Sequence, residues 1–163
     1  MGRSGGFSHL VPGGGARMVN VSAKRATRRS AVAEAWVSVG PGIARRLRAS
    51  GGVAKGNVLE TARLAGILGA KQTANLIPMC HPLGLDSVEI EAELVADRVR
   101  IVAIARCEGK TGVEMEAMTA ACVAALTVYD MVKSAGRGVQ IGPVRLLEKS
   151  GGKSGSWRRR AGE

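Results

Sequence analysis

Hydrophobic and polar residues alternate over two neighbouring stretches in the middle of the chain. Residues 86–94 place an apolar side chain at every second position with glutamates between them. Residues 98–106 alternate in the same way, with Val99, Ile101 and Ala103 on one side. Strict alternation predicts strands with one buried face. The short segment VADR between them predicts a hairpin turn, so we expect an antiparallel pair of strands here.

Apolar residues recur at helical spacing in three other stretches. Residues 57–76 begin at Asn57, a favourable N-cap residue, with a glutamate three positions further on. Residues 113–135 are rich in alanine and are followed by glycine, as is typical of a buried helix. Residues 42–50 carry a shorter pattern of the same kind. These stretches predict three helices.

Two further strands are expected, one on either side of these elements. Residues 35–39 precede a GPG turn, and residues 139–147 contain Gly142–Pro143, which favours an edge position or a bulge. If the short helix 42–50 is set aside, the main elements follow the order β-α-β-β-α-β. This order predicts an α+β, ferredoxin-like fold, in which two helices cover one face of an antiparallel sheet.

The charge of the chain is concentrated at its two ends. The 163 residues carry a formal net charge of +11. The first 33 residues hold six basic and no acidic residues, and the last 19 hold six basic and two acidic ones, whereas the body between them holds 12 basic and 11 acidic residues. We therefore expect a single domain over 1–163 with flexible, glycine-rich arms at about 1–17 and 149–163.

Composition excludes several classes of protein. Aromatic residues make up 2% of the chain, too few for the stacking platforms of single-strand nucleic-acid modules. The alanine-rich uncharged run 117–129 is shorter than the roughly 20 residues of a membrane helix, and the N-terminus shows no apolar signal segment. The three cysteines lack any C-x-x-C spacing, which argues against a disulfide framework or a zinc site. We expect a cytoplasmic protein that binds neither nucleic acid nor membrane.

A histidine lies in an irregular segment between a predicted helix and a predicted strand. His81 is one of two histidines, and Pro78 and Pro82 flank it in the segment LIPMCHPLGL. The prolines hold the backbone extended on both sides, so the segment can aim a side chain at a ligand. The alternative is that His81 contacts no ligand and only makes a hydrogen bond within its loop. No Cys/His cluster lies nearby, so a metal pair of Cys80 and His81 is not expected.

Acidic residues lie near both ends of the predicted helix 113–135. Thr111 and Glu114 fit a capping box, which would give Glu114 a structural role, whereas Glu116 points to a different face. Asp130 and Lys133 share a face, either as a surface ion pair or as an acid–base couple suited to proton transfer. The two groups of residues are over ~20 Å apart along one helix. If both are catalytic, they must meet across a subunit interface.

Three blocks of the chain resemble one known family. The blocks KGNVLETARLAGILGAKQTANLIPMCHPLGLDSVEIE, GKTGVEMEAMTAACVAALTVYDMVKS and IGPVRLLEKSGGKSGSW are similar to the cyclic pyranopterin monophosphate synthase family, molybdenum cofactor biosynthesis protein C. The resemblance runs from about Phe7 to Trp157. It implies a lyase that converts 3′,8-cyclo-7,8-dihydro-GTP to cyclic pyranopterin monophosphate and releases pyrophosphate. It also implies a homohexamer, a trimer of dimers with active sites at subunit interfaces, which uses no redox cofactor and takes Mg²⁺ with the substrate phosphates.

The resemblance also implies site residues. Its catalytic positions match Asp130, Lys133, Lys55 and His81. Its substrate-binding positions match Met79, Cys80, His81, Glu114, Met115, Glu116, Lys71, Arg29 and Lys153, and no residue is assigned as a metal ligand. Our hypothesis is that Asp130 and Lys133 transfer protons, with a lysine pKa lowered toward neutrality, while Arg29 and Lys153 hold phosphates.

The sequence departs from the family pattern at three positions. Asn20 and Asn57 replace the usual aspartates, and Glu60 replaces the usual alanine. The first two changes remove an acid near the expected site. They keep open the alternative of an inactive, scaffold-type paralogue. A basic RNA-binding module on a ferredoxin-like frame is a further alternative.

Overall fold

The structure is a computed structural model that describes residues 17–50, 52–53, 56–160 and 162. The strands are β1 (Thr27–Ser38), β2 (Gly52–Val53), β3 (Gly56–Asn57), β4 (Ser87–Val95), β5 (Arg98–Gly109), β6 (Gln140–Ser150) and β7 (Trp157–Arg158). The helices are α1 (Gly40–Ser50), α2 (Val58–Lys71), α3 (Thr73–Leu76) and α4 (Glu114–Val132), and a 3₁₀ turn, η1 (Lys133–Ala135), follows α4.

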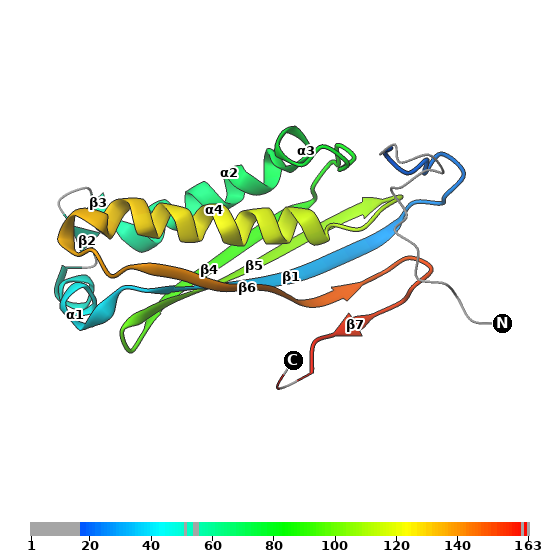
Figure 1. The fold of residues 1–163 in the computed structure, drawn as a ribbon. Helices are drawn as coiled ribbons and strands as arrows, with labels where there is room; N and C mark the ends of the chain where they lie inside the picture. Colours follow the sequence, from blue (N-terminus) through cyan, green and yellow to red (C-terminus); the bar gives the residue numbers. More distant parts are fainter. Residues whose placement is uncertain (1–16, 51, 54–55, 161, 163) are drawn as a thin grey trace.

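Five of the strands form one antiparallel sheet in the order β4-β5-β1-β6-β7. Helices α2 and α4 lie side by side on one face of this sheet, and α1 lies near the end of the sheet where α4 ends (Figure 1). Strands β2 and β3 form a separate small ladder. The mixed α+β class, the antiparallel sheet and the hairpin of β4 and β5 were therefore predicted correctly.

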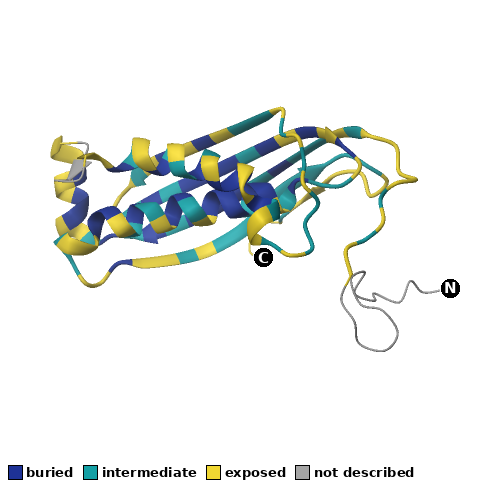
Figure 2. Ribbon diagram, turned by 90° about the horizontal axis from the view of Figure 1, so that it is seen from above, coloured by how far each residue is buried: buried dark blue, intermediate teal, exposed yellow. Residues whose placement is uncertain are grey.

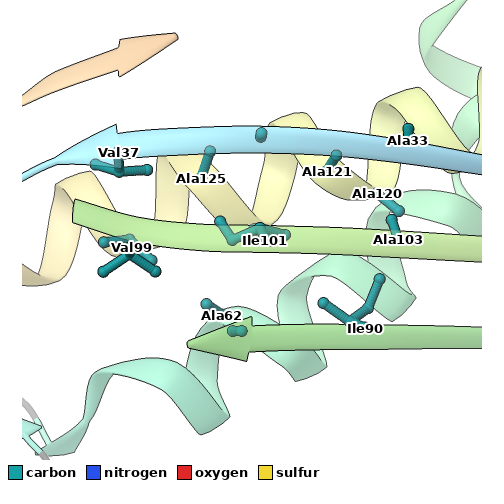
Figure 3. Close-up of a cluster of buried hydrophobic side chains, with 14 of the residues drawn as sticks. Ala33, Val37, Ala62, Ile90, Val99, Ile101, Ala103, Ala120, Ala121 and Ala125 are labelled. Carbon is teal, nitrogen blue, oxygen red and sulfur yellow. The ribbon is translucent and has the colours of Figure 1, made fainter. Parts of the chain in front are cut away.

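The core between the sheet and the helices is built mainly from alanine, valine and isoleucine. Ala33 and Val37 of β1, Ile101 of β5 and Ala121 of α4 are fully buried at this interface (Figure 3). Buried residues gather where the helices cover the sheet, while the outer helix faces are largely exposed (Figure 2). Small side chains let the helices approach the sheet closely, so a domain with few aromatic residues still closes its core.

Strand β1 is longer than the predicted strand 35–39. It spans 12 residues, and all of them pair with β5. The alternation of Ala31, Ala33 and Ala35 marks its buried face, but Arg28 precedes these alanines and Glu34 interrupts them. Alanine is a weak strand former, so the pattern predicted only the part of the strand that contains tryptophan and valine.

The C-terminal part of the chain is more ordered than an arm beginning at 149. Strand β6 runs to Ser150, and β7 pairs with its end through Trp157 and Arg158. The register between β1 and β6 shifts where Gly142–Pro143 lies, so the expected bulge is confirmed. Most of β6 is also an edge, because β7 is only two residues long. The N-terminal arm, residues 1–16, lies outside the described residues.

The predicted helix 57–76 is divided into α2 and α3 at Gln72. The predicted cap is confirmed, because Asn57 Oδ1 accepts a hydrogen bond from the backbone N–H of Glu60 at 3.1 Å. An asparagine in place of the family's usual aspartate therefore still caps this helix. The side chain of Glu60 pairs with Arg63.

The stretch Glu114–Ala135, α4 with η1, is long and apolar enough to cross a membrane by length and composition alone. In the fold it covers the sheet, and about half of its apolar window, 56%, is buried. Its fully buried residues, such as Ala117, Ala124 and Val128, pack in the core. These contacts are those of the core helix of a globular domain.

Helices α2 and α4 approach each other closely at Gly69. A Cβ atom added to Gly69 would lie 2.8 Å from Val123 Cγ2, closer than real Cβ contacts allow. Alanine would favour the helix by about 1 kcal/mol, but forcing the helices apart costs about 1–3 kcal/mol. We expect Gly69→Ala to lower the free energy of unfolding, measured by urea denaturation. Gly42→Ala in α1, where nothing lies within 4 Å, is the control and should not destabilise the protein. A Gly69→Ala protein as stable as the parent would contradict this packing.

Candidate functional site

Three segments distant in sequence meet at the end of the sheet where β5 ends and α4 begins (Figure 1). They enclose a cavity of about 420 Å³, here called the histidine cavity. Its lining residues come from the segment before β1, the loop after α3, and the start of α4. They are Val19, Val21, Lys24, Met79, Cys80, His81, Leu83, Thr111, Gly112, Glu114, Met115 and Glu116.

Two cation-lined cavities adjoin the histidine cavity. The arginine cavity, about 630 Å³, contains Arg29 and Lys153 together with Lys24, Arg25, Thr27, Gly152 and Ser154. The bridging cavity, about 160 Å³, is lined by residues of both, among them Arg29 and Glu114, and adds Lys110 and Lys149. Lys24 lines all three cavities. A negatively charged ligand that extends from the histidine cavity would therefore meet a series of cations.

Glu114 lies where the histidine and bridging cavities meet. The expected capping box with Thr111 is absent, because the N-cap of α4 is Val113 and no side chain caps it. Instead, Glu114 Oε1 accepts a hydrogen bond from Lys149 Nζ at 2.9 Å. Burial acts to raise the pKa of Glu114, but the bond from Lys149, its own backbone N–H and the charges of Lys149 and Arg29 lower it below its ordinary value. Glu114 is therefore held as a carboxylate.

Glu116, which the resemblance also places among the substrate-binding positions, lines the same cavity as Glu114. Only 4% of its surface is exposed. Burial raises its pKa, its own backbone N–H opposes this, and the negative charge of Glu114 raises it further. The pKa values of the two carboxyls are thus pushed in opposite directions, which is the arrangement that separates a proton donor from a charged partner.

His81 makes a hydrogen bond that defines which of its ring nitrogens carries a proton. Its Nε2 lies 2.8 Å from the carbonyl oxygen of Val19. A carbonyl can only accept, so Nε2 donates, and Nδ1 takes no part in this bond. Beside it, burial and the charge of Glu116 raise the pKa of the Cys80 thiol. Cys80 therefore lines the cavity as a thiol rather than as a nucleophilic thiolate.

Arg29 is held in place by backbone on two sides. Its Nε donates to the carbonyl of Gly109 at 3.3 Å, and the turn Gly151–Gly152 passes over its guanidinium group. Gly152 has a φ of +72°, and a Cβ there would lie 2.1 Å from an Arg29 guanidinium nitrogen. The glycines thus allow the chain to close around Arg29.

Gly152→Ala should move the guanidinium group of Arg29 out of this position. The alanine would also strain a backbone conformation that L residues rarely adopt, at a cost of about 1–2 kcal/mol. We expect binding of pyrophosphate, measured by calorimetry, to weaken about tenfold, since a charge-assisted hydrogen bond contributes about 1.5–3 kcal/mol. Gly155→Ala, also at positive φ but with nothing within 4 Å, controls for the backbone strain. Equal pyrophosphate affinities of the two variants would contradict the role of Gly152.

Asp130 and Lys133 lie at the opposite end of α4. Lys133 Nζ is 2.6 Å from Asp130 Oδ1, and both side chains are 55% exposed. Asp130 follows Glu116 by 14 positions, which corresponds to about 21 Å along the helix. The hydrogen bond and charge of Asp130 raise the pKa of Lys133, which is opposite to the lowering that our hypothesis for a catalytic lysine requires. Within this chain, the two residues form an exposed ion pair that lines none of the three cavities.

Two predicted site residues remain, Lys71 and Lys55. Lys71, at the end of α2, is exposed and lines none of the three. Lys55 lies outside the described residues. Sequence reasoning missed Lys24, Lys110 and Lys149. Lys110 and Lys149 lie within the blocks that resemble the family, but neither was singled out as a site residue. Lys24 carries no local signal beyond its charge.

Among the described residues, no group of three or more His, Cys, Asp or Glu side chains could hold a metal ion. Glu114, the carboxylate that lines the bridging cavity together with the cations, is already paired with Lys149. The described side chains therefore do not form a cage for a divalent cation. Mg²⁺ usually binds through one or two carboxylates together with substrate phosphates.

An acid–base cavity that opens toward a series of cations, beside a helix-covered antiparallel sheet, is suited to binding a phosphorylated small molecule. The family model described as MoaC family matches residues 18–152. The chain belongs to the MoaC family.

Curated relatives cover nearly the whole chain. A protein from Methylobacterium sp. (strain 4-46) is 55% identical over 153 residues, which cover 93% of this chain and 95% of the relative. One from Brucella ovis is 51% identical over 156 residues, 94% of each chain. One from Streptomyces avermitilis is 51% identical over 153 residues, 94% of this chain and 89% of the relative. All three carry the name cyclic pyranopterin monophosphate synthase.

Proposed function

We propose that this chain is a cyclic pyranopterin monophosphate synthase of molybdenum cofactor biosynthesis. It converts the cyclised dihydro-GTP to cyclic pyranopterin monophosphate and pyrophosphate by general acid–base catalysis, which makes it a lyase. The observation that carries this proposal is that the histidine cavity, with its acid–base residues, opens into cavities lined by Lys24, Arg29 and Lys153. A compact ring system with a triphosphate needs both parts. The names of relatives at 51–55% identity support the same reaction.

Formation of a cyclic phosphate with loss of pyrophosphate defines what the site must do. A sugar hydroxyl oxygen attacks the α-phosphorus and loses its proton, while the bond from that phosphorus to the β-phosphate oxygen breaks. Arg29, Lys153 and Lys24 would stabilise the charge on the departing pyrophosphate. His81 Nδ1 and Glu116 would exchange protons with the ring system in the histidine cavity. Met79, Cys80 and Met115 supply adaptable walls for that ring.

The positions of the acidic residues support an active site shared between subunits. Asp130 and Lys133 are too far from the histidine cavity of their own chain to reach the same substrate. We propose that they complete the site of a neighbouring subunit in a homohexamer built as a trimer of dimers. Leu64, Leu68 and Leu126 are all about 60–70% exposed on the outer faces of α2 and α4. Such apolar helix faces favour contact with another subunit.

The sheet order supports a ferredoxin-like frame for each subunit. Without the short β7, the strands lie in the order β4-β5-β1-β6, with α2 and α4 on one face. The first and third main strands are then neighbours, as two split β-α-β units require.

The proposal assigns no redox cofactor, because proton transfers and phosphoryl chemistry account for the reaction. Mg²⁺ would enter with the triphosphate of the substrate, and no step above depends on it. The substrate derives from GTP, so we propose the cytoplasm as the place where the enzyme works.

The decisive experiment is an assay of pyrophosphate release from the cyclised dihydro-GTP by the purified full-length chain. Turnover is the expected result. A silent but hexameric protein would instead indicate a scaffold-type paralogue. Salt-sensitive RNA binding without turnover would indicate an RNA-binding module. Asn20 and Asn57 do not favour the inactive alternative, because each still accepts a local backbone hydrogen bond.

A further inference from the structure

The segment before β1, residues 18–24, crosses the site and forms one wall of the histidine cavity. Figure 1 shows it beside the loop that follows α3, at the end of the sheet where β5 ends. Val19, Val21 and Lys24 line the cavity. Lys24 is the residue of this segment that also reaches the arginine and bridging cavities. The position of the segment therefore determines whether this lysine faces the ligand.

Two hydrogen bonds within the segment shape its turns. Asn20 Oδ1 accepts from the backbone N–H of Ser22 at 2.9 Å, and the carbonyl of Val21 accepts from the backbone N–H of Lys24 at 3.0 Å. An asparagine that accepts from the backbone two residues further on forms an Asx turn. These bonds determine the local shape of the segment, but they do not attach it to the rest of the protein.

Two side chains from elsewhere in the fold attach the segment to the site. His81 Nε2 donates to the carbonyl of Val19 at 2.8 Å, and Lys110 Nζ donates to the carbonyl of Ser22 at 3.0 Å. The second contact joins residues 88 positions apart. Lys110 directly precedes Thr111, which lines the histidine cavity, so its ammonium group links the start of the α4 segment to the opposite wall.

We propose that Lys110 is a positioning residue for substrate binding, which holds the 18–24 segment by the Ser22 carbonyl so that Lys24 is presented to the substrate phosphates. This role rests on the proposed function, since it assumes a phosphorylated substrate in these cavities. An ammonium group has three donors, and one bond to a carbonyl leaves its charge intact. Lys110 thus acts on the substrate through Lys24 and not as the principal phosphate contact.

The test uses Lys110→Met, which keeps the length of the side chain and removes the donor. Hydrogen exchange of the ligand-free protein reports whether the 18–24 segment is held, because the amides of Ser22 and Lys24 are hydrogen-bonded. Steady-state kinetics with the cyclised dihydro-GTP report KM and kcat separately. Lys110→Arg restores a donor. Arg48→Met is the matched control, because Arg48 also donates to a backbone carbonyl, that of Ala96. Neither Arg48 nor Ala96 lines any of the three cavities.

Lys110→Met removes one charge-assisted hydrogen bond. We therefore expect about tenfold faster hydrogen exchange of residues 18–24 and about a tenfold higher KM. The value of kcat should stay within about twofold of the parent. Lys110→Arg should restore both, and Arg48→Met should change neither. Unchanged exchange with a raised KM would overturn the positioning role, because Lys110 would then act as a direct phosphate contact. Unchanged KM with faster exchange would overturn it as well. If the parent protein shows no turnover, the proposed function fails. The exchange measurement would then still decide whether Lys110 holds the segment.

Discussion

Lys133→Ala is expected to lower turnover of the cyclised dihydro-GTP by about two to four orders of magnitude, the usual contribution of a positioned proton-transfer group. Lys133 is exposed and paired only at the surface, so the substitution should leave the free energy of unfolding nearly unchanged. The decisive measurement is subunit complementation. Lys133→Ala subunits mixed with Glu116→Gln subunits should recover activity, because the two residues lie at opposite ends of α4 and would serve different sites.

The recovered activity can be estimated from the proposed two-fold interface. Random mixing makes about half of the dimers hybrid, and one of the two sites in each hybrid has both residues intact. About a quarter of the parent activity should therefore return. A mixture of Lys133→Ala and Asp130→Asn is the matched control and should stay inactive, since these two residues belong to the same end of one helix. Recovery in neither mixture would exclude a shared site, and a fully active Lys133→Ala protein would exclude the catalytic role.

Glu116→Gln should lower kcat by about two to four orders of magnitude while KM changes little. Glutamine fills the same buried position and keeps the neutral shape of the protonated acid, but it cannot release a proton. Glu91→Gln on the exposed face of β4 is the control and should behave as the parent. A Glu116→Gln protein with unchanged kcat would show that this carboxyl only lines the cavity.

The pKa directions of the two carboxyls also predict the pH dependence of turnover. The pKa of Glu116 is raised by burial and by Glu114, so its proton is retained to higher pH than for an ordinary glutamate. As a proton donor it should lose activity when the pH rises through that pKa. The pKa of Glu114 is lowered, so the carboxylate that holds Lys149 should be lost only at low pH. Lys149→Met removes the bond and charge that lower the pKa of Glu114, so we expect the acid limb of the kcat profile to move to higher pH. The alkaline limb should be unaffected.

Local sequence patterns predicted the elements of this fold well where the apolar side chains are large. The alternation around Ile90 and Ile101 defined β4 and β5, and the apolar stretch after Glu116 defined α4. The pattern was weak in β1, where the face toward the helices is mostly alanine and the opposite face carries Arg28 and the buried Glu34. The extent of that strand depends on pairing with β5, which no local window contains.

The candidate site was predicted only in part, because a local stretch of sequence does not contain the distant partners of its residues. The segments around His81 and Glu114 were found because unusual residues lie next to each other in the chain. Lys24, Lys110 and Lys149 were not found as site residues, because each is an ordinary cation whose partner lies far away in sequence. Lys149 meets Glu114 across 35 positions, and Lys110 meets Ser22 across 88.

The amino-acid sequence by itself determined the α+β class, the family resemblance and the distance between the two ends of α4, because these depend on residue order and helix geometry. Tertiary structure decided which of the charged residues share a cavity. It also decided the opposite pKa shifts of Glu114 and Glu116, and the raised rather than lowered pKa of Lys133. These depend on burial and on charges brought together through space, since the interaction between two charges depends on their distance and surroundings rather than on their separation along the chain.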